Sequence, residues 1–340
     1  MMDKRLPVGK LEPELLEELL GGLHSDDSAV ILGPGIGRDV TVLEWGEGDR
    51  YLLAKTDPIT FATDEIGFYA VAVNTNDVAT SGGVPRWFLA TLLLPDDASD
   101  EELARMIFDQ IDRACRDLEI SLVGGHTEVT YDLDRPILVG FMLGEVEKDR
   151  LVTSEGAEVG DHLLLTKRVS VEGTSIIARE KGDALADRGF AEDAIERARD
   201  MLHDPGITVL HEAQMAVEAG EVHAMHDPTE GGIATGLHEL AMASEVGLMV
   251  QLDDIPVYPE TESFCEVFDV DPLGLIASGS LLLSVKPEDS EAVIAAIRDT
   301  GIECAQIGRV VEEKAGIKLR RGLNWVDLPR YDQDEISKLF

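Results

Sequence analysis

The sequence predicts an α+β fold in which two halves each combine a largely antiparallel sheet with helices. Three observations lead to this prediction. The chain has 340 residues, enough for two domains of ordinary size, and 44% of them are hydrophobic, enough to fill two cores. Strand-like and helical patterns follow one another without the strict strand–helix alternation of parallel sheets. Glycines punctuate residues 152–160, after which a strand–loop–helix pattern starts again, so we predict domains at residues 1–152 and 153–340.

In the first half, apolar spacing and turn residues define the expected elements. Helical spacing predicts three helices, the last of which starts with a capping box, Ser99-x-x-Glu102. Apolar runs bounded by turn residues predict six strands, and the last two flank a loop at residues 124–134. The predicted helices are 11–20, 65–81 and 99–118, and the predicted strands are 28–32, 40–45, 51–55, 86–94, 120–123 and 136–146.

The second half shows the same mixture of patterns. It begins with an apolar strand, which is followed by a helical region that ends at about residue 220. Further strands and helices then follow in an irregular order, as expected for an α+β domain. The predicted strands are 162–166, 222–226, 247–252, 280–285 and 306–310, and the later helices are 232–244 and 288–300.

The composition is strongly acidic. Asp and Glu number 67 against 29 Lys and Arg, so the formal net charge is −38. Such a chain cannot replace the counterions of nucleic acid and is not attracted to an anionic membrane surface, so both are excluded as general partners. The acids are spread along the whole chain. Dispersed negative charge of this kind is typical of halophilic proteins, whose self-repulsion is screened by high salt.

We expect a cytoplasmic protein with reduced cysteines. No apolar run approaches the ~20 residues that a membrane-spanning helix needs. Residues 1–11 show charges without the apolar stretch of a signal peptide. Cys115, Cys265 and Cys304 lie far apart and form no CxxC pair, which favours buried free thiols over a disulfide framework.

Three short segments place acidic side chains at unusual positions. Asp39 follows two glycines between predicted strands, a pattern that fits an ordinary turn as well as a site. Asp57 ends a predicted apolar strand, where it serves either as a solvated strand end or as a ligand. Asn76 and Asp77 belong to the polar run 74–77 in the middle of an apolar helix, where such residues are poor helix formers. Their apolar neighbours favour a functional cluster over a solvated helix face.

Two glycine-rich segments carry a hydroxyl group and a carboxylate, Gly124-Gly125-His126-Thr127-Glu128 and Asp227-Pro228-Thr229-Glu230-Gly231-Gly232. The second leads into a predicted helix, whose N-terminal N–H groups and dipole favour an anion. A phosphate beside so many carboxylates needs a hard cation between them, which predicts phosphate held through Mg²⁺. His223 and His226 point to opposite faces of a predicted strand, so we expect packing roles for them rather than a shared metal site.

The order of these motifs resembles the aminoimidazole ribonucleotide synthase-like superfamily. The chain carries Gly-x-Gly-x-Asp-x-x-Val, Thr-Asp, Asn-Asp-x-Ala-x-x-Gly-x-x-Pro, Gly-Gly-x-Thr and Asp-Pro-Thr-x-Gly-Gly in that order. The resemblance covers about residues 30–315. It is closest to the HypE-type hydrogenase-maturation dehydratases, through residues 223–232, 255–257 and 271–273.

This resemblance implies an N-terminal domain that forms a homodimer and a C-terminal domain that closes the active site. It also implies that acids from both domains bind Mg-ATP, and that an oxygen of a small molecule or of a protein-borne group is activated by phosphoryl transfer. The implied metal ligands are Asp39, Asp57, Asp77 and Asp227. The implied nucleotide contacts are the first three of these acids with Asn76, Gly124, Gly125, Thr127, Thr229, Gly231 and Gly232. The implied catalytic residues are His126, Glu128 and Asp227, and Lys167 with residues 172–174 occupies the place of a further family loop.

Two candidates remain for the first acid of the pattern. Asp27 lies in a segment that also resembles a family motif, whereas Asp39 lies 18 residues before Asp57, a separation that fits one hairpin. We prefer Asp39 for that reason.

The chain departs from the family at two places. His126 stands where relatives often carry aspartate, and imidazole is a poor Mg²⁺ ligand, so one metal is lost or Glu128 substitutes. The C-terminal Pro-Arg-Ile-Cys of HypE-type proteins is absent, and we therefore expect no nitrile-forming step of hydrogenase maturation. The alternative to an ATP-dependent enzyme is a nucleotide-binding maturation or regulatory protein without turnover.

Overall fold

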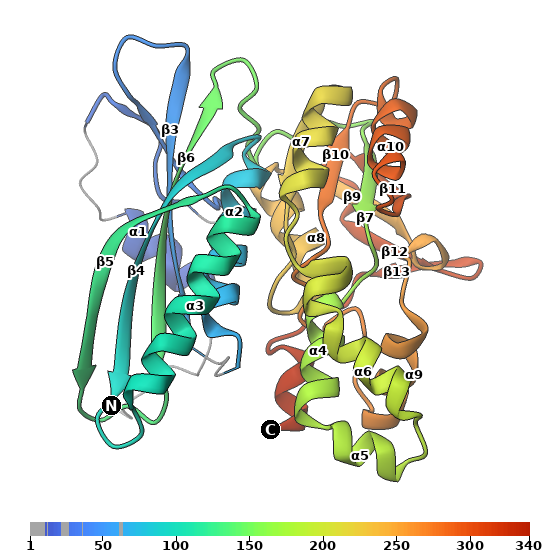
Figure 1. Ribbon diagram of the computed structural model, residues 1–340. Coiled ribbons are helices and arrows are strands. Elements are labelled where there is room, and N and C mark those ends of the chain that lie inside the picture. Colours follow the sequence, from blue (N-terminus) through green and yellow to red (C-terminus); the bar gives the residue numbers. More distant parts are fainter. Residues whose placement is uncertain (1–10, 12, 22–26, 36, 61–63) are drawn as a thin grey trace, which may run out of the picture.

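The computed structural model describes residues 11, 13–21, 27–35, 37–60 and 64–340. It contains two β-sheets, one in each half of the chain, and each sheet is packed with helices (Figure 1). The predicted α+β class with a two-domain arrangement is confirmed. The proposed boundary between residues 152 and 153 falls in the connection between the last strand of the first sheet and the first strand of the second.

The first sheet has six strands in the order β1-β2-β3-β6-β4-β5. Neighbouring strands are antiparallel except β4 and β5, which are parallel. The parallel pair follows from helix α3, which connects the two strands as a crossover. The elements of this half are α1 (Pro13–Gly21), β1 (Val30–Leu32), β2 (Thr41–Glu44), β3 (Arg50–Ile59), α2 (Ile66–Thr80), β4 (Val84–Pro95), α3 (Glu101–Asp117), β5 (Ser121–Thr130) and β6 (Ile137–Glu147).

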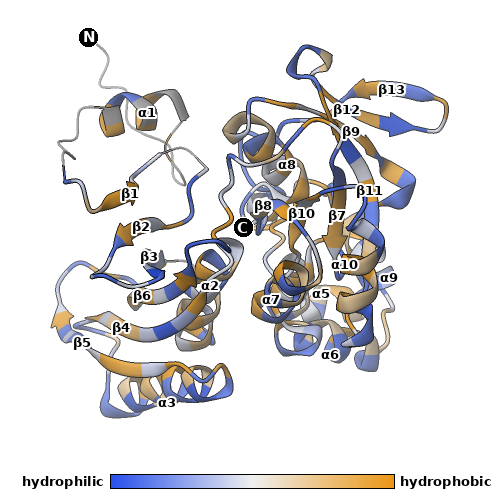
Figure 2. Cartoon of the chain, turned by 90° about the horizontal axis from the view of Figure 1, so that it is seen from above, coloured by the Kyte–Doolittle hydropathy of each residue, from blue (hydrophilic) through white to orange (hydrophobic). Residues whose placement is uncertain are grey.

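Helices α2 and α3 cover one face of the first sheet and leave the other face open. Strand β6 shows the alternation clearly, because Leu138 and Met142 are fully buried in the core shared with the helices. Phe141 points to the opposite face and is 39% exposed, as is Trp87 of β4 at 37%. The open face therefore carries apolar side chains where a solvated face of an antiparallel sheet normally carries polar ones. Apolar residues along β4 and β5 are visible in orange in Figure 2.

The prediction of a loop at residues 124–134 is wrong. Residues Ser121–Thr130 form the edge strand β5, which pairs with β4. The prediction failed because a glycine pair usually marks a turn. Here Gly125 has a φ of +151°, and a Cβ at this position would lie 2.0 Å from the carbonyl oxygen of Ala90. The glycine is needed for close approach to β4, and it does not end the strand.

Two further boundaries differ from the predictions. Strand β3 continues to Ile59, so Asp57 lies inside a strand and not at its end. Helix α3 is capped by Asp100, whose carboxylate accepts a hydrogen bond from the N–H of Leu103 at 2.8 Å. Ser99 was the predicted cap, but the carboxylate one position later satisfies the same free N–H groups.

The second sheet has seven strands in the order β13-β12-β9-β11-β7-β10-β8. Leu163 and Leu165 of β7 face the core formed with α8, whereas Leu164 faces the core formed with α7 and α10. Both faces are covered, which explains the continuous apolar runs in the central strands. The elements are β7 (His162–Thr166), α4 (Val171–Glu180), α5 (Gly182–Asp187), α6 (Glu192–Asp200), α7 (Leu210–Ala219), β8 (Val222–His226), α8 (Gly232–Ala243), β9 (Gly247–Gln251), α9 (Pro259–Phe268), β10 (Leu282–Val285), α10 (Ser290–Asp299), β11 (Cys304–Val311), β12 (Ile317–Arg321) and β13 (Asn324–Asp327).

Helix α2 joins the two halves. It packs against α7 and β8 of the second half as well as against its own sheet (Figure 1). The side chain of Asn76 donates to the carbonyl oxygen of Ile207 at 2.9 Å and accepts from the N–H of Val209 at 2.9 Å. These two bonds fix α2 to the segment that leads into α7. Among the described residues, no helix is long and apolar enough to cross a membrane.

Candidate active site

Four aspartates that are distant in sequence meet where α2 faces the end of β8. Asp39 precedes β2, Asp57 lies in β3, Asp77 lies in α2, and Asp227 follows β8 directly. The charges of the other three all raise the pKa of Asp77, so the four side chains lie close together. We call these four residues the aspartate cluster. It lies at the junction of the two halves, with three acids from the first half and one from the second.

Lys55 is a cation inside the aspartate cluster that the sequence analysis did not assign a role. Its Nζ lies 3.2 Å from Asp77 Oδ2 and 3.6 Å from Asp57 Oδ2. Burial alone would lower the pKa of Lys55, but the charges of Asp77, Asp57 and Asp39 raise it above its ordinary value. Lys55 is therefore charged at neutral pH and neutralises part of the cluster. Its position two residues before Asp57 puts both side chains on the same face of β3, a signal that was present in the sequence.

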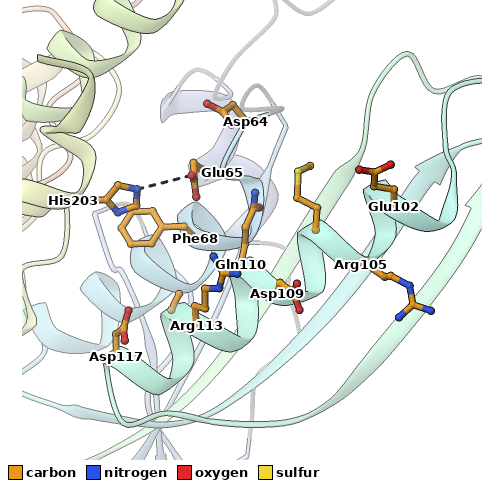
Figure 3. Close-up of a pocket in the computed structure, with 12 residues that line it drawn as sticks. Asp64, Glu65, Phe68, Glu102, Arg105, Asp109, Gln110, Arg113, Asp117 and His203 are labelled. Atoms are coloured by element: carbon orange, nitrogen blue, oxygen red, sulfur yellow. Dashed lines mark ion pairs between the residues drawn. The ribbon is translucent and has the colours of Figure 1, made fainter. Parts of the chain in front are cut away.

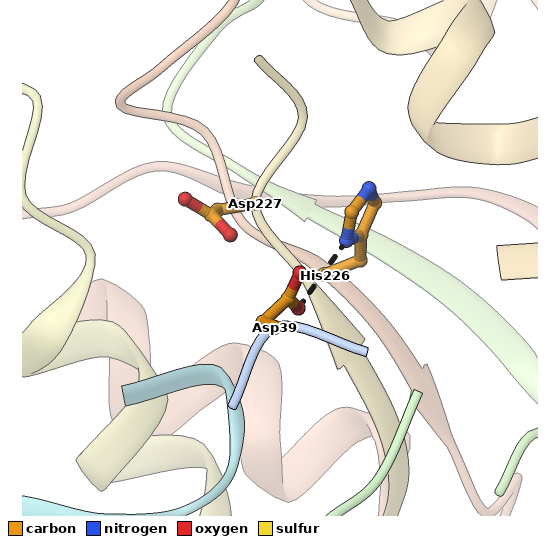
Figure 4. A group of neighbouring side chains, drawn as sticks. All are labelled: Asp39, His226 and Asp227. Carbon is orange, nitrogen blue, oxygen red and sulfur yellow. Dashed lines mark ion pairs between the residues drawn. The ribbon is translucent and has the colours of Figure 1, made fainter. Parts of the chain in front are cut away.

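His226 is the second cation of the cluster. Its Nδ1 lies 3.6 Å from Asp39 Oδ2 (Figure 4). Its Nε2 lies 2.8 Å from Glu239 Oε2. Burial lowers its pKa, but the hydrogen bonds with Asp39 and Glu239 raise it well above the ordinary value of histidine. His226 therefore contributes a positive charge to the cluster in addition to the packing role expected from the sequence. The prediction that it shares no site with His223 agrees with the structure, because His223 Nδ1 pairs with Asp161 at 2.9 Å.

The cluster holds four carboxyl groups but only two cationic side chains. Burial and the nearby charge of Asp39 together raise the pKa of Asp227 to about 7. Burial also raises the pKa of Asp77 well above its ordinary value, although Lys55 opposes this. Buried carboxylates of this kind are stabilised by a bound cation. Ligand atoms of Asp39, His226 and Asp227 all lie within 4.8 Å of one another, so the donor set fits a divalent ion.

The structure favours Asp39 over Asp27 as the first acid of the pattern. Asp39 accepts a hydrogen bond from the hydroxyl of Thr80 at 3.4 Å and lies beside His226. Asp27 is exposed, and its Oδ1 accepts a hydrogen bond from the N–H of Ala29 at 2.9 Å, a local turn contact. The hairpin of β2 and β3 brings Asp39 next to Asp57, as its spacing from Asp57 suggested.

The polar run 74–77 is fully buried, but its members have different roles. Asn76 uses both ends of its amide on the backbone of the second half, so it orients α2. Asn74 donates to the carbonyl oxygen of Ala70 at 2.8 Å and at longer range to that of Asp57. Only Asp77 turns its charged group into the aspartate cluster. The run therefore combines one site residue with side chains that position it.

The glycines after Asp227 serve the packing of the second half. The N–H of Gly231 donates to Asp334 Oδ2 at 2.6 Å, and the N–H of Gly232 donates to the carbonyl oxygen of Thr229 at 3.1 Å. Gly232 has a φ of +64°, and a Cβ there would lie 2.5 Å from the carbonyl oxygen of Leu273. A phosphate contact at Gly231 would require displacement of Asp334, and one at Gly232 would compete with the carbonyl oxygen of Thr229. The sequence analysis missed this carboxylate, because it lies about a hundred residues further along the chain.

His126 and Glu128 lie on the face of the first sheet that is opposite to the cluster. They pair with Thr91 and Leu93 of β4, whose side chains point away from the helices. Lys55 and Asp57 pair with Met142 and Gly140, which lie under the helices. The predicted catalytic role of His126 and Glu128 therefore has no support within one chain. They pair with each other at 3.1 Å, and both are more than half exposed.

Of the remaining residues predicted on β5, Gly124 and Thr127 are exposed on the edge strand, and Gly125 packs on Ala90. The two glycine-rich segments are thus similar in sequence but not in structure. One segment is an edge strand, and the other is the start of a helix.

Lys167 and Glu172 are both buried in the second half of the chain. Lys167 Nζ lies 2.6 Å from Glu212 Oε1 and donates to the carbonyl oxygen of Thr208 at 2.7 Å. Glu172 lies in the first turn of α4, and burial raises its pKa to about 7. Lys167 therefore fixes α7 to the end of β7 and does not reach the aspartate cluster.

A separate cavity of about 580 Å³ lies beside α2 and α3 (Figure 3). Its wall includes Phe68 and His203, whose rings meet edge to face at 4.5 Å, and Arg113 of α3. It shares no lining residue with the aspartate cluster. The sequence analysis predicted no functional residue here.

Comparisons with known proteins agree with this arrangement. Residues 25–146 match the N-terminal domain of AIR synthase related proteins, and residues 158–319 match the C-terminal domain. The chain is 26% identical to a putative hydrogenase expression/formation protein of Methanocaldococcus jannaschii, over 83% of each chain. It is 30% identical to the carbamoyl dehydratase HypE of Azotobacter vinelandii, over 76% of this chain and 73% of that protein.

A solved structure shares the fold. The structure of the hydrogenase maturation protein HypE in complex with ATP superimposes with a TM-score of 0.71. The match covers 93% of this chain and 91% of the other at 24% sequence identity. The match spans both halves of the chain and shows that the two proteins share this fold.

Proposed function

Because this chain belongs to the AIR synthase related protein family, we propose that it is a Mg-ATP-dependent enzyme that activates an oxygen by phosphoryl transfer. The single observation that carries the proposal is the pair Asp39 and Asp227. These two carboxylates face each other across the junction of the two halves, and burial raises the pKa of Asp227 to about 7. Such a pair is costly in an empty protein and is stabilised by a divalent cation that carries a phosphate.

The residues of the cluster have different roles in the proposed binding of Mg-ATP. A Mg²⁺ ion held here would neutralise the negative charge that develops on the transferred phosphoryl group. Asp39 and Asp227 would bind it, while Lys55 holds Asp57 and Asp77 in place and supplies a further positive charge. Asn76 orients the helix that carries Asp77. In phosphoryl transfer, positioning and charge neutralisation account for most of the catalysis, so these roles are sufficient for the reaction class.

Relatives with known names support the proposal. The similar protein of Azotobacter vinelandii is named a carbamoyl dehydratase, and the similar HypE structure was solved in complex with ATP. We propose the same nucleotide for this chain. The acceptor oxygen belongs to a small molecule or to a group carried by another protein.

The test of turnover is the release of ADP by the purified chain, with and without Mg²⁺ and with carbamoyl-, amide- and carboxylate-containing acceptors. We expect Mg²⁺-dependent ADP release that at least one acceptor accelerates, because a bound acceptor held near the nucleotide speeds phosphoryl transfer. Tight Mg-ATP binding without ADP release under any of these conditions would instead favour a nucleotide-binding maturation or regulatory protein.

We also propose a homodimer that forms through the open face of the first sheet. Phe141 and Trp87 are 39% and 37% exposed on that face, and Val123 and Val129 of the edge strand β5 are 54% and 59% exposed. An exposed apolar sheet face beside an unpaired edge strand is a typical interaction surface. His126 and Glu128 lie on the same face and would be covered by the partner subunit.

Replacing Phe141 by aspartate is expected to convert the dimer into a monomer, because it places a charge in the apolar interface. Light scattering at high salt, where the net charge of −38 is screened, should give twice the 37.0 kDa of one chain for the unchanged protein. Phe108→Asp is the matched control, because Phe108 is similarly exposed, at 45%, but lies on α3. A monomer mass for the unchanged protein at all concentrations would contradict the proposal.

A further inference from the structure

The cavity beside α2 and α3 contains an arginine that forms no ion pair with any residue that the structure describes. Helix α3 carries three arginines, each with an acid four residues before it. Arg116 pairs with Asp112 at 2.8 Å, and Arg105 likewise pairs with the acid one turn before it. Arg113 has Asp109 at the same spacing, but the two are not paired, and both line the cavity. The guanidinium group of Arg113 is therefore available to a ligand.

The same wall of the cavity carries acids without a cation. Within the described part of the chain, neither Asp109 nor Asp117 forms an ion pair, although each lies one helical turn from Arg113. One turn of four residues separates them from Arg113 by ~6 Å along the helix axis. The side chain of Arg113 extends from α3 on the side that faces Phe68 (Figure 3). Opposite charges held apart in one cavity match a ligand that carries both signs.

A second donor lies beside the guanidinium group. Gln110 is three residues before Arg113, so the two side chains are neighbours on the helix surface. Its Oε1 accepts a hydrogen bond from the N–H of Gly67 at 3.0 Å, which fixes the orientation of the amide. The NH2 end of this amide has no partner among the described residues and belongs to the cavity wall. Arg113 and Gln110 together offer the donors that a carboxylate accepts.

The rest of the wall is partly apolar and comes from both halves of the chain. The rings of Phe68 on α2 and His203 between α6 and α7 meet edge to face, with their centroids 4.5 Å apart. His203 Nε2 lies 4.0 Å from Glu65 Oε1, which holds the ring at the cavity (Figure 3). Met106 of α3 is 43% exposed and adds a flexible apolar side chain. These groups form a surface for the apolar part of a ligand.

We propose that this cavity binds a free amino acid with an apolar side chain. The carboxylate of the ligand pairs with Arg113 and Gln110, its ammonium group with Asp109 or Asp117, and its side chain lies against Phe68. A simple anion would meet the two acids, and a simple cation would leave Arg113 unpaired. The volume of about 580 Å³ is within the range of small-molecule sites, about 300–1,000 Å³. The site is separate from the aspartate cluster, and the inference does not depend on Mg-ATP binding.

The experiment is saturation-transfer-difference NMR of the full chain without nucleotide, with L-phenylalanine, L-leucine and L-methionine as probes. We expect at least one of them to bind with a Kd of about 1 mM or tighter. Analogues of the tightest binder without the amino group or without the carboxylate should bind about tenfold more weakly or worse, because each leaves one charge of the cavity unpaired. For phenylalanine these analogues are 3-phenylpropionate and 2-phenylethylamine.

Two arginine variants place the binding site. Arg113→Gln removes the anchor for the carboxylate and should weaken binding by about tenfold or more. Arg116→Gln is the matched control, because Arg116 is also exposed on α3 but pairs with Asp112 and lies outside the cavity. It should leave the affinity unchanged. Both arginines are exposed, so both variants are expected to fold.

Three results would overturn the proposal. The first is that none of the three amino acids binds the unchanged protein. The second is that an analogue with only one charged group binds as tightly as the amino acid, which would indicate a site for an anion or for a cation alone. The third is that both arginine variants change the affinity equally. None of these results depends on ADP release, so the Mg-ATP proposal is tested separately.

Discussion

Replacing Asp227 by asparagine is expected to weaken Mg²⁺-dependent ATP binding by about a hundredfold or more, close to 2.7 kcal/mol. Asparagine keeps the shape of the side chain but removes the charge that faces Asp39. Losing a direct metal ligand should weaken binding more than losing a residue that only orients a ligand. The second kind of loss already weakens metal binding about 10- to 100-fold. Isothermal titration calorimetry with ATP in the presence of Mg²⁺ or EDTA measures the effect directly.

The same substitution should not destabilise the protein without metal. Burial raises the pKa of Asp227 to about 7, so its ionised form opposes folding; that cost is fully present above the raised pKa, decreases as the pH falls below it, and is gone below the ordinary aspartate pKa of about 4. Asparagine removes this cost, and the free energy of unfolding at pH 8 should stay the same or rise. Asp161→Asn is a control at another buried aspartate of the second half and should leave ATP binding unchanged. Equal affinity for Mg-ATP in the Asp227 variant and the unchanged protein would contradict the assignment.

Replacing Lys167 by methionine is expected to lower the free energy of unfolding by about 3–5 kcal/mol. The side chains of Lys167 and Glu212 are only 3% and 2% exposed, and their charged atoms are 2.6 Å apart. Methionine fills a similar volume but leaves the carboxylate of Glu212 buried without its cation, which is the costly part. Unfolding in urea at constant high salt, followed by circular dichroism, gives the free energy.

A double variant separates the buried charge from lost packing. Lys167→Met with Glu212→Leu removes both charges, and most of the stability should return, because a well-packed apolar pair often replaces a buried ion pair without loss. Lys286→Met is the surface control: Lys286 pairs with Glu221 at 2.7 Å, but both side chains are about half exposed, so its effect should be small by comparison. An equally small effect for Lys167→Met would contradict the assignment of a structural ion pair.

The central strands and most helices followed from sequence because their periodicity is local. Strand β7 and helix α2, for example, lie close to their predicted positions. Strand β5 did not, because glycine has two uses that local sequence cannot separate: it ends strands, and it permits close contact between them. The contact of Gly125 with Ala90 depends on a strand about 35 residues away in the sequence.

The acids of the site were predictable for a different reason. Asp39 and Asp77 interrupt apolar or glycine-rich patterns, and an interruption of this kind is a local signal. Lys55 and His226 interrupt nothing, because a lysine in a half-exposed strand and a histidine at a strand end are both ordinary. Their roles appear only when the two halves meet and their charges face Asp77 and Asp39. His126 lies on the face of the sheet away from the cluster, and its position in the motif could not indicate that face.

The most direct test of the account is a crystal structure of the full chain with Mg²⁺ and a non-hydrolysable ATP analogue. We expect an ion bound by Asp39 and Asp227 at about 2.0–2.1 Å, and the phosphates of the analogue attached to it at the junction of the two halves. Binding of the analogue elsewhere, for instance in the cavity lined by Phe68, His203 and Arg113, with no ion on Asp39 or Asp227, would contradict the proposed site.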